Sequence, residues 1–186
     1  MRIFRFVLPL LVVLAVCSPA YSQTDTRYFL KLDQIPGEST DAQHPNEIEV
    51  LSAAIGVLQP QLQRFAGGGA SASKTEVSPI AISKFVDKSS PVLFLNCATG
   101  KRIPTAVLTA RRSAEPPVDY YTITLSDVLI SSVSQGASEG GVIETVNLSF
   151  SKITLTYVPS TANGTPGTPV TVSFDLKANK PFTPPQ

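Results

Sequence analysis

The chain has 186 residues, 42% of them hydrophobic, and its 15 Lys and Arg nearly balance 14 Asp and Glu, for a formal net charge of +1. A near-neutral chain whose longest basic cluster is Arg111-Arg112 lacks a phosphate-binding surface, which argues against nucleic acid as a partner. A single His, no HExxH motif and no carboxylate pair on a predicted helix argue against an enzyme, a cofactor site or a metal site.

Residues 1–22 have the pattern of a secretory signal peptide. Arg2 and Arg5 precede an apolar run at 6–17, and small residues flank a predicted cleavage between Ser22 and Gln23. The run is shorter than the roughly 20 residues of a membrane-spanning helix. The residues before Cys17 resemble a lipoprotein box, but a branched valine stands where a small residue is needed, so simple export is favoured.

Cleavage would leave a single domain at 23–186 with 13 basic and 14 acidic residues. A chain of this length can bury a core without disulfides, and Cys97 is the only cysteine left, so no intramolecular disulfide can form. We expect a secreted or periplasmic protein that has no membrane attachment after cleavage.

The mature chain is predicted to be mainly β, because Pro, Gly, Ser and Thr punctuate short segments of alternating apolar character. In the first strand, 27–33, Tyr28, Leu30 and Leu32 share one face. A long polar loop follows at 33–47, and loops of this length often bind something. Further strands are predicted at 46–58, where a helix is the alternative, and at 75–86 and 102–112, whose prolines suit strand ends or sheet edges.

One short helix is predicted at about 90–99. Ser90 can cap its start, Pro91 suits the first position and Gly100 can end it. The alternative, a strand at 92–98, would have to bury Asn96. The helix is apolar nearly all round, which predicts burial against the sheet, with Cys97 as a small buried hydrophobe.

Lys84, Asp87 and Lys88 precede this helix and pose a question about function. They could form a reaction centre, or Asp87 could cap the helix or pair with a lysine. The second interpretation is favoured, because the three residues lie in the connection that leads into the helix. Cys97 as a nucleophile would need a base, and His44, the only histidine, lies about fifty residues upstream in a polar loop.

Two longer core strands are predicted at 120–133 and 141–159, joined through a hairpin connection. Their alternation slips phase, at Asp127 in the first, so each should contain a β-bulge that bends it. Glu139 and Glu144 are interpreted as solvated acids at strand edges. The last strand is predicted at 170–177. Its apolar residues, beginning with Val170 and Val172, alternate along one face, so the strand should be half-buried.

The stretches ISKFVDKSSPVLFLNCATGK (82–101), YYTITLSDVLISSVSQG (120–136) and ETVNLSFSKITLTYVP (144–159) resemble the haemolysin-coregulated protein (Hcp) family, the tube subunit of bacterial type VI secretion. YFLKLDQIPGESTD near the start and VTVSFDLKANKPF near the end also match, so the resemblance covers nearly all of the mature chain in the same order.

The resemblance implies a compact β-barrel of two packed antiparallel sheets with one flanking helix. It also implies homo-hexameric rings that stack into a tube, carry small effector proteins and meet other secretion-system components. In that family the long loop contacts neighbouring subunits, which here would involve Gly37, Glu38, Ser39, Thr40, Asp41 and His44.

The signal peptide departs from the family pattern, because tube proteins leave the cell through their own machine. It keeps an alternative open: a monomeric secreted module that retains the fold and binds a protein or a glycan through the 33–47 loop.

Overall fold

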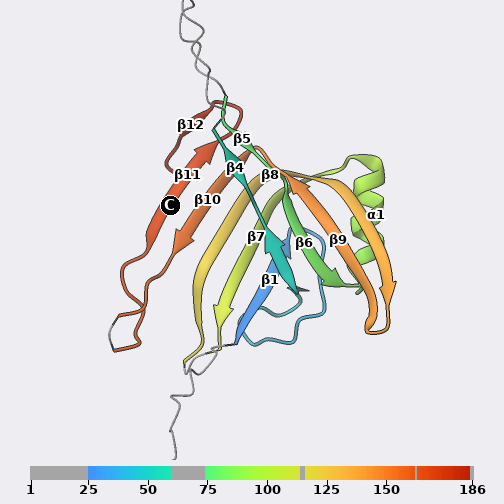
Figure 1. The fold of residues 1–186 in the computed structure, drawn as a ribbon, viewed down its shortest axis with the longest axis horizontal. Helices are drawn as coiled ribbons and strands as arrows, with labels where there is room; N and C mark the ends of the chain where they lie inside the picture. Colours follow the sequence, from blue (N-terminus) through green and yellow to red (C-terminus); the bar gives the residue numbers. More distant parts are fainter. Residues whose placement is uncertain (1–24, 60–73, 114–115, 162, 185–186) are drawn as a thin grey trace, which may run out of the picture.

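The computed structural model describes residues 25–59, 74–113, 116–161 and 163–184, so the predicted signal peptide and its Ser22–Gln23 cleavage site lie outside the described residues (Figure 1). The described chain is mainly antiparallel β with one helix, as predicted. In chain order the elements are β1 (Thr26–Leu32), β2 (Ile48–Val50), β3 (Ser52–Ala54), β4 (Val57–Leu58), β5 (Glu76–Val77), β6 (Ile80–Phe85), α1 (Ser90–Thr99), β7 (Arg102–Arg112), β8 (Val118–Ser138), β9 (Gly141–Ser149), β10 (Lys152–Tyr157), β11 (Val170–Asp175) and β12 (Lys180–Pro181).

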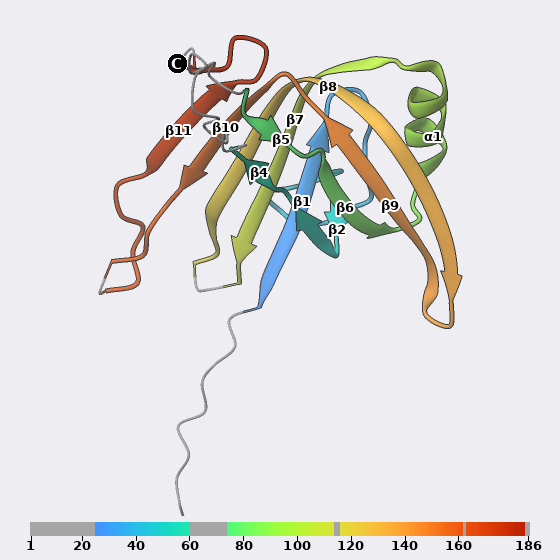
Figure 2. The same cartoon turned by 45° about the horizontal axis from the view of Figure 1, so that its top comes forward.

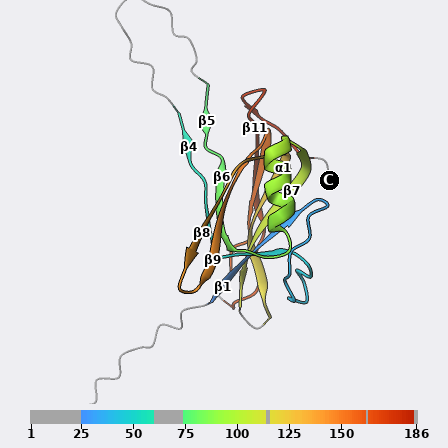
Figure 3. The same ribbon diagram turned by 90° about the vertical axis from the view of Figure 1, so that its right-hand side faces the viewer.

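The main sheet is built around β8. Its strands follow the order β12-β11-β10-β8-β7-β1-β2, while β9, β6 and β3 continue from the second half of β8. The short pair β4-β5 forms a separate ribbon that extends away from this body (Figure 3).

The predicted change of phase in the first core strand is confirmed at Asp127. This residue has a positive φ of 55°, and Leu125 and Val128 on either side of it are both buried. An extra residue lies further on, because the register with β9 shifts between Ile130 and Ser132. The backbone irregularities therefore let β8 keep its apolar residues in the core while it bends.

The prediction of one continuous strand at 141–159 was wrong. β9 pairs with β8 from Leu129 onward, whereas β10 pairs with β8 up to Ser126. The chain breaks between the two strands because it follows the bend at Asp127, whose carboxylate accepts a hydrogen bond from the Ser151 hydroxyl.

The segment predicted as one strand at 46–58 is also divided. β2 pairs with β1 and β3 pairs with β6, and between them the Leu51 amide donates to the Ser83 carbonyl. These short ladders bring β1 and β6 near each other, but among the described residues no continuous strand closes a barrel.

The core lies between the β1-β7-β8 part of the sheet and β6-β9, with α1 against β8 at one flank (Figure 2). It consists mainly of aliphatic side chains from β1, β2 and the strands β6 to β10, including Leu30, Ile48, Ile82, Leu125 and Leu148. Phe29 is buried as well, although its neighbours Tyr28 and Leu30 were predicted to supply the buried face. The 33–47 loop covers its side of β1, which explains this second buried face.

The helix is confirmed, with two corrections. Its N-cap is Ser89 rather than Ser90, and Gly100 ends it in a left-handed conformation with φ of 66°. Leu93 and Asn96 are buried, but Phe94 and Leu95 are 63% and 58% exposed. The helix was expected to be buried nearly all round, yet it contacts the sheet along one face only.

The last strand is likewise less buried than its alternation predicted. Phe174 and Leu176 pack against the core, but Val170 and Val172 are 62% and 60% exposed. Apolar alternation reveals which face of a strand is apolar, whereas burial depends on whether another layer of the same chain covers that face.

Candidate functional site

The 33–47 loop folds back on itself, and its two halves are joined by backbone hydrogen bonds. The Gly37 amide donates to the Asn46 carbonyl at 2.8 Å, and the Ser39 amide donates to the Glu47 carbonyl at 3.0 Å. A Cβ added to Gly37 would lie 2.3 Å from the Glu47 oxygen, so only glycine permits this close approach.

Asp41 attaches the loop to two strands. Its carboxylate pairs with Arg27 of β1 at 3.0 Å and with Arg111 of β7 at 2.8 Å. The hydrogen bond from the Gln43 amide, with the positive charges of Arg111 and Arg27, lowers the pKa of Asp41 from its usual value despite partial desolvation. Arg112 also has partners within the chain, because it donates to the Ser160 hydroxyl and lies over the Tyr120 ring, so both members of the Arg111-Arg112 cluster are used internally.

His44, the only histidine in the sequence, attaches the same loop to the core. Its ring stacks on Phe29 with 4.4 Å between centroids. Nδ1 lies 3.0 Å from a Glu47 oxygen and Nε2 lies 3.2 Å from an Asp119 oxygen. Because the ring is buried against the body of the protein, His44 acts as a structural contact between the loop and β8.

The six residues predicted to contact neighbouring subunits thus divide into two groups. Gly37, Ser39 and His44 are buried, and Asp41 is engaged by the arginines, whereas Glu38 and Thr40 are exposed. The role of the loop in oligomer contact stays a prediction, and Glu38 and Thr40 are the members accessible to a partner.

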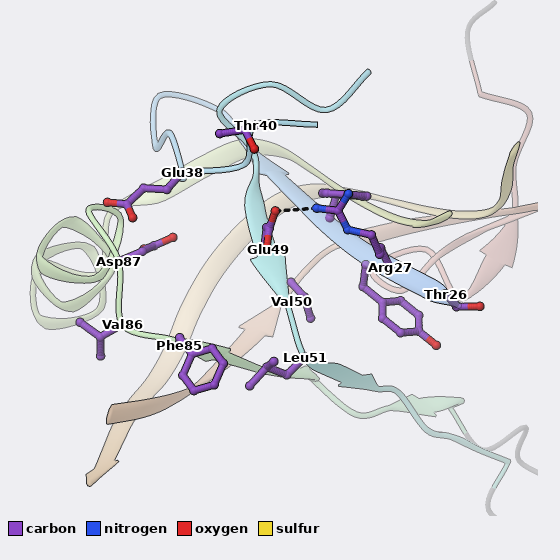
Figure 4. A pocket seen from close by; sticks show the side chains of 12 residues that line it. Thr26, Arg27, Glu38, Thr40, Glu49, Val50, Leu51, Phe85, Val86 and Asp87 are labelled. Atoms are coloured by element: carbon purple, nitrogen blue, oxygen red, sulfur yellow. Dashed lines mark hydrogen bonds and ion pairs between the residues drawn. The ribbon is translucent and has the colours of Figure 1, made fainter. Parts of the chain in front are cut away.

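These two residues border an open groove of about 610 Å³ (Figure 4). Its apolar side is formed by Leu51, Phe85 and Val86, and the Arg27–Glu49 ion pair, 2.7 Å long, spans its opposite side. The groove offers a mixed polar and apolar surface at the junction of β2, β6 and the loop.

Lys84 and Asp87 form a buried polar network, not a solvent-accessible reaction centre. Lys84 is 1% exposed and Glu144 is completely buried. The Lys84 ammonium contacts Asp87 at 2.9 Å, the Ser90 hydroxyl at 3.0 Å and Glu144 at 3.4 Å, and Glu144 also accepts from Gln135. The network joins β6, β9 and β8 to the start of α1.

Two sequence interpretations change with this network. Glu144 was expected at a solvated strand edge, but it lies directly across the ladder from Lys84 and is buried. Opposite charge at directly facing positions of neighbouring strands is the signal that could have identified the pair. Lys88, in contrast, is exposed.

A second polar cluster surrounds Asp127 at the bend of β8. Its carboxylate pairs with Lys177 at 2.7 Å and with Arg102 at 2.8 Å, and accepts from Ser151. Hydrogen bonds from Lys177, then Ser151, then Arg102 hold the pKa of Asp127 well below its usual range. The cluster connects β7, β8 and the turn after β11.

Two further features of the described residues bear on catalysis, a serine motif and Cys97. A Gly-x-Ser-x-Gly sequence at 136–140 lies at the tip of the β8-β9 hairpin, not at the strand-to-helix turn where that motif exposes a nucleophile. Cys97 is partly buried on α1. Among the described residues no cluster of three potential metal ligands occurs, and none of the helices in this part of the chain is long and apolar enough to cross a membrane.

Comparison with known proteins shows relatives along most of the chain. The family model described as "Type VI secretion system effector, Hcp" matches residues 29–157. Protein hcp1 of Pseudomonas aeruginosa is 39% identical over 155 residues, which represent 81% of this chain and 95% of that protein.

Solved structures agree with this assignment. Hcp1 from Salmonella typhimurium is 37% identical with a TM-score of 0.70, and the match covers 84% of this chain and 99% of that one. A structure titled "Structure of a type six secretion system protein" has 27% identity and a TM-score of 0.78, with 85% and 100% of the two chains covered. Fold, family model and sequence identity agree, so the chain belongs to the Hcp family of type VI secretion proteins.

Proposed function

We propose that this chain is an exported structural protein of type VI secretion that assembles into hexameric rings, which stack into a tube. The proposal extends the family membership to the assembly that the Hcp resemblance implies. The observation that carries it is that one chain leaves two separate apolar surfaces exposed, one on α1 with Phe94 and Leu95 and one on β11 with Val170 and Val172. Monomeric proteins rarely leave contiguous apolar patches exposed unless another molecule covers them.

The internal polar networks suit a scaffold. Lys84–Glu144 and Asp127 connect strands and the helix within one chain, and the 33–47 loop is held by Asp41 and His44. A subunit with such fixed loops can present the same surfaces to each neighbour in a ring. Effector proteins carried in the lumen and other secretion components are the further partners that this role entails.

Native mass spectrometry of residues 23–186 tests the ring, and electron microscopy of the same sample tests stacking. We expect a dominant hexamer and ring-shaped particles. A chain that remains monomeric at micromolar concentration would contradict the proposal.

Export through the predicted leader is a separate part of the proposal. Cell fractionation of the full chain, followed by N-terminal sequencing, should give a protein outside the cytoplasm that begins at Gln23. Uncleaved protein in the cytoplasm would contradict the predicted signal peptide but would leave the proposal of a hexameric ring untouched.

A second candidate function is a monomeric secreted module that binds a protein or a glycan. The groove beside Glu38 and Thr40 favours it, because it combines apolar side chains with exposed carboxylates. Deleting the loop would remove the buried contacts of His44 and disturb folding, so Glu38→Lys is the sharper change. If the module interpretation holds, the wild-type chain should bind in a glycan array and Glu38→Lys should abolish that binding. If the chain only forms rings, neither protein should give a glycan signal.

A further inference from the structure

The sheet face that forms the core continues beyond it onto an uncovered surface. We call β10 and β11 the C-terminal wing; they lie at one end of the molecule (Figures 1 and 2). Ile123, Leu155 and Val172 face each other across β8, β10 and β11. Residues directly opposite on neighbouring strands share a face, so Val172 continues a row that begins in the core.

Exposure rises along this row. Ile123 is 5% exposed, Leu155 is partly buried and Val172 is 60% exposed. The adjacent row, Tyr121, Tyr157 and Val170, follows the same trend toward the edge strand. The wing therefore has a core-like face that the described part of the same chain does not cover.

Helix α1 carries a matching apolar surface. Pro91, Phe94, Leu95 and Ala98 are all exposed, and their spacing of i, i+3, i+4 and i+7 places them along one side of a helix. We call these four residues the helix stripe. No charged residue occurs between Lys88 and Lys101, so the solvent-facing side of α1 lacks the polar character of an ordinary surface helix.

The two surfaces lie at opposite flanks of the molecule, α1 at one side of the ribbon and the wing at the other (Figures 1 and 2). They differ in shape, since one is a helix and the other a sheet face. Two different complementary patches on opposite flanks produce head-to-tail contacts, which close into a ring when the rotation between subunits permits.

We propose that the helix stripe of one copy packs against the exposed face of the C-terminal wing of the next copy. This inference rests on the proposed ring and assigns the two surfaces that meet in it. Val170 and Val172 then become buried as their alternation predicts, with the second layer supplied by a neighbouring subunit. Phe94 and Leu95 become buried in the same contact.

The experiment uses Leu95→Asp and Val172→Asp, each of which adds a charge to an exposed side chain and so spares the core. Each test variant has a matched control. Lys88→Asp places a carboxylate just before the helix, outside the helix stripe, and Thr171→Asp places one on the opposite face of β11 from Val172. Circular dichroism checks that all four variants fold. Native mass spectrometry, with one variant isotope-labelled, measures assembly.

We expect wild-type protein and both controls to form hexamers, and each test variant alone to be monomeric. An equimolar mixture of Leu95→Asp and Val172→Asp should form a heterodimer, because one intact helix stripe can meet one intact wing. Rings that persist in either test variant, or homodimers of either, would overturn the assignment, the latter in favour of self-complementary contacts. A monomeric wild-type chain would instead contradict the ring itself.

Discussion

Replacing Lys84 by Met tests the buried polar network most directly. Methionine keeps most of the side-chain volume but removes the ammonium group that contacts Asp87, Ser90 and Glu144. Glu144 is completely buried. In the variant it loses its partner on β6 and keeps the hydrogen bond from the Gln135 amide of β8. The variant therefore leaves a carboxylate in the core without its counter-ion.

The expected loss of unfolding free energy is about 3–5 kcal/mol, the usual cost of removing one partner of a buried ion pair. Lys88→Met is the matched control. Lys88 is exposed four residues further on, and its replacement should change stability by less than about 0.5 kcal/mol.

Urea unfolding followed by far-UV circular dichroism measures both variants, since the chain has no Trp to report by fluorescence. All samples need the same protein concentration, because assembly adds to apparent stability. Adding Glu144→Leu to Lys84→Met should recover much of the loss, because the uncompensated charge is then gone. If Lys84→Met unfolds at the same urea concentration as Lys88→Met, the reasoning is refuted.

Three further predictions follow from particular residues. Because hydrogen bonds lower the folded-state pKa of Asp127, its contribution is present above the ordinary Asp pKa of about 4 and is lost as pH falls below it. Asp127→Asn should therefore be less stable than wild type near neutral pH, with a gap in urea midpoint that closes on acidification; a gap independent of pH would argue against this. Gly37→Ala should cost about 1–3 kcal/mol by forcing the loop off the Glu47 carbonyl. Gly136→Ala, whose added Cβ meets nothing within 4 Å, should be nearly neutral in the same urea titration. Gly100→Ala should lower stability by about 1–2 kcal/mol, because φ is 66° at this helix end; an unchanged thermal midpoint would contradict the strain.

Much of the fold could be predicted from local pattern. The helix followed from Pro91 and Gly100, and the bend in β8 followed from the phase change at Asp127. The break between β9 and β10 could not be predicted in this way, because a bulge and a strand break give the same shift of apolar parity. Only the pairing of both strands with different halves of β8 distinguishes them.

The candidate site was less predictable than the fold. The 33–47 loop was identified by its length and polarity, but the burial of His44 on Phe29 depends on a contact between distant parts of the chain. Glu144 was assigned to a solvated edge because a carboxylate in a glycine-rich setting usually lies there. Its partner Lys84 is 60 residues away in sequence, so the pair appears only once β6 and β9 are adjacent.

The sequence by itself determined the strand-rich composition, the helix and its ends, and the family, because these depend on short-range periodicity and on residues in a fixed order. Tertiary structure decided which apolar faces are covered. Val172 and Leu125 look alike in their local patterns, yet one lies in the open wing and the other in the core. Burial depends on what a second layer of protein covers, and for the wing and the helix stripe that layer is absent from the described chain.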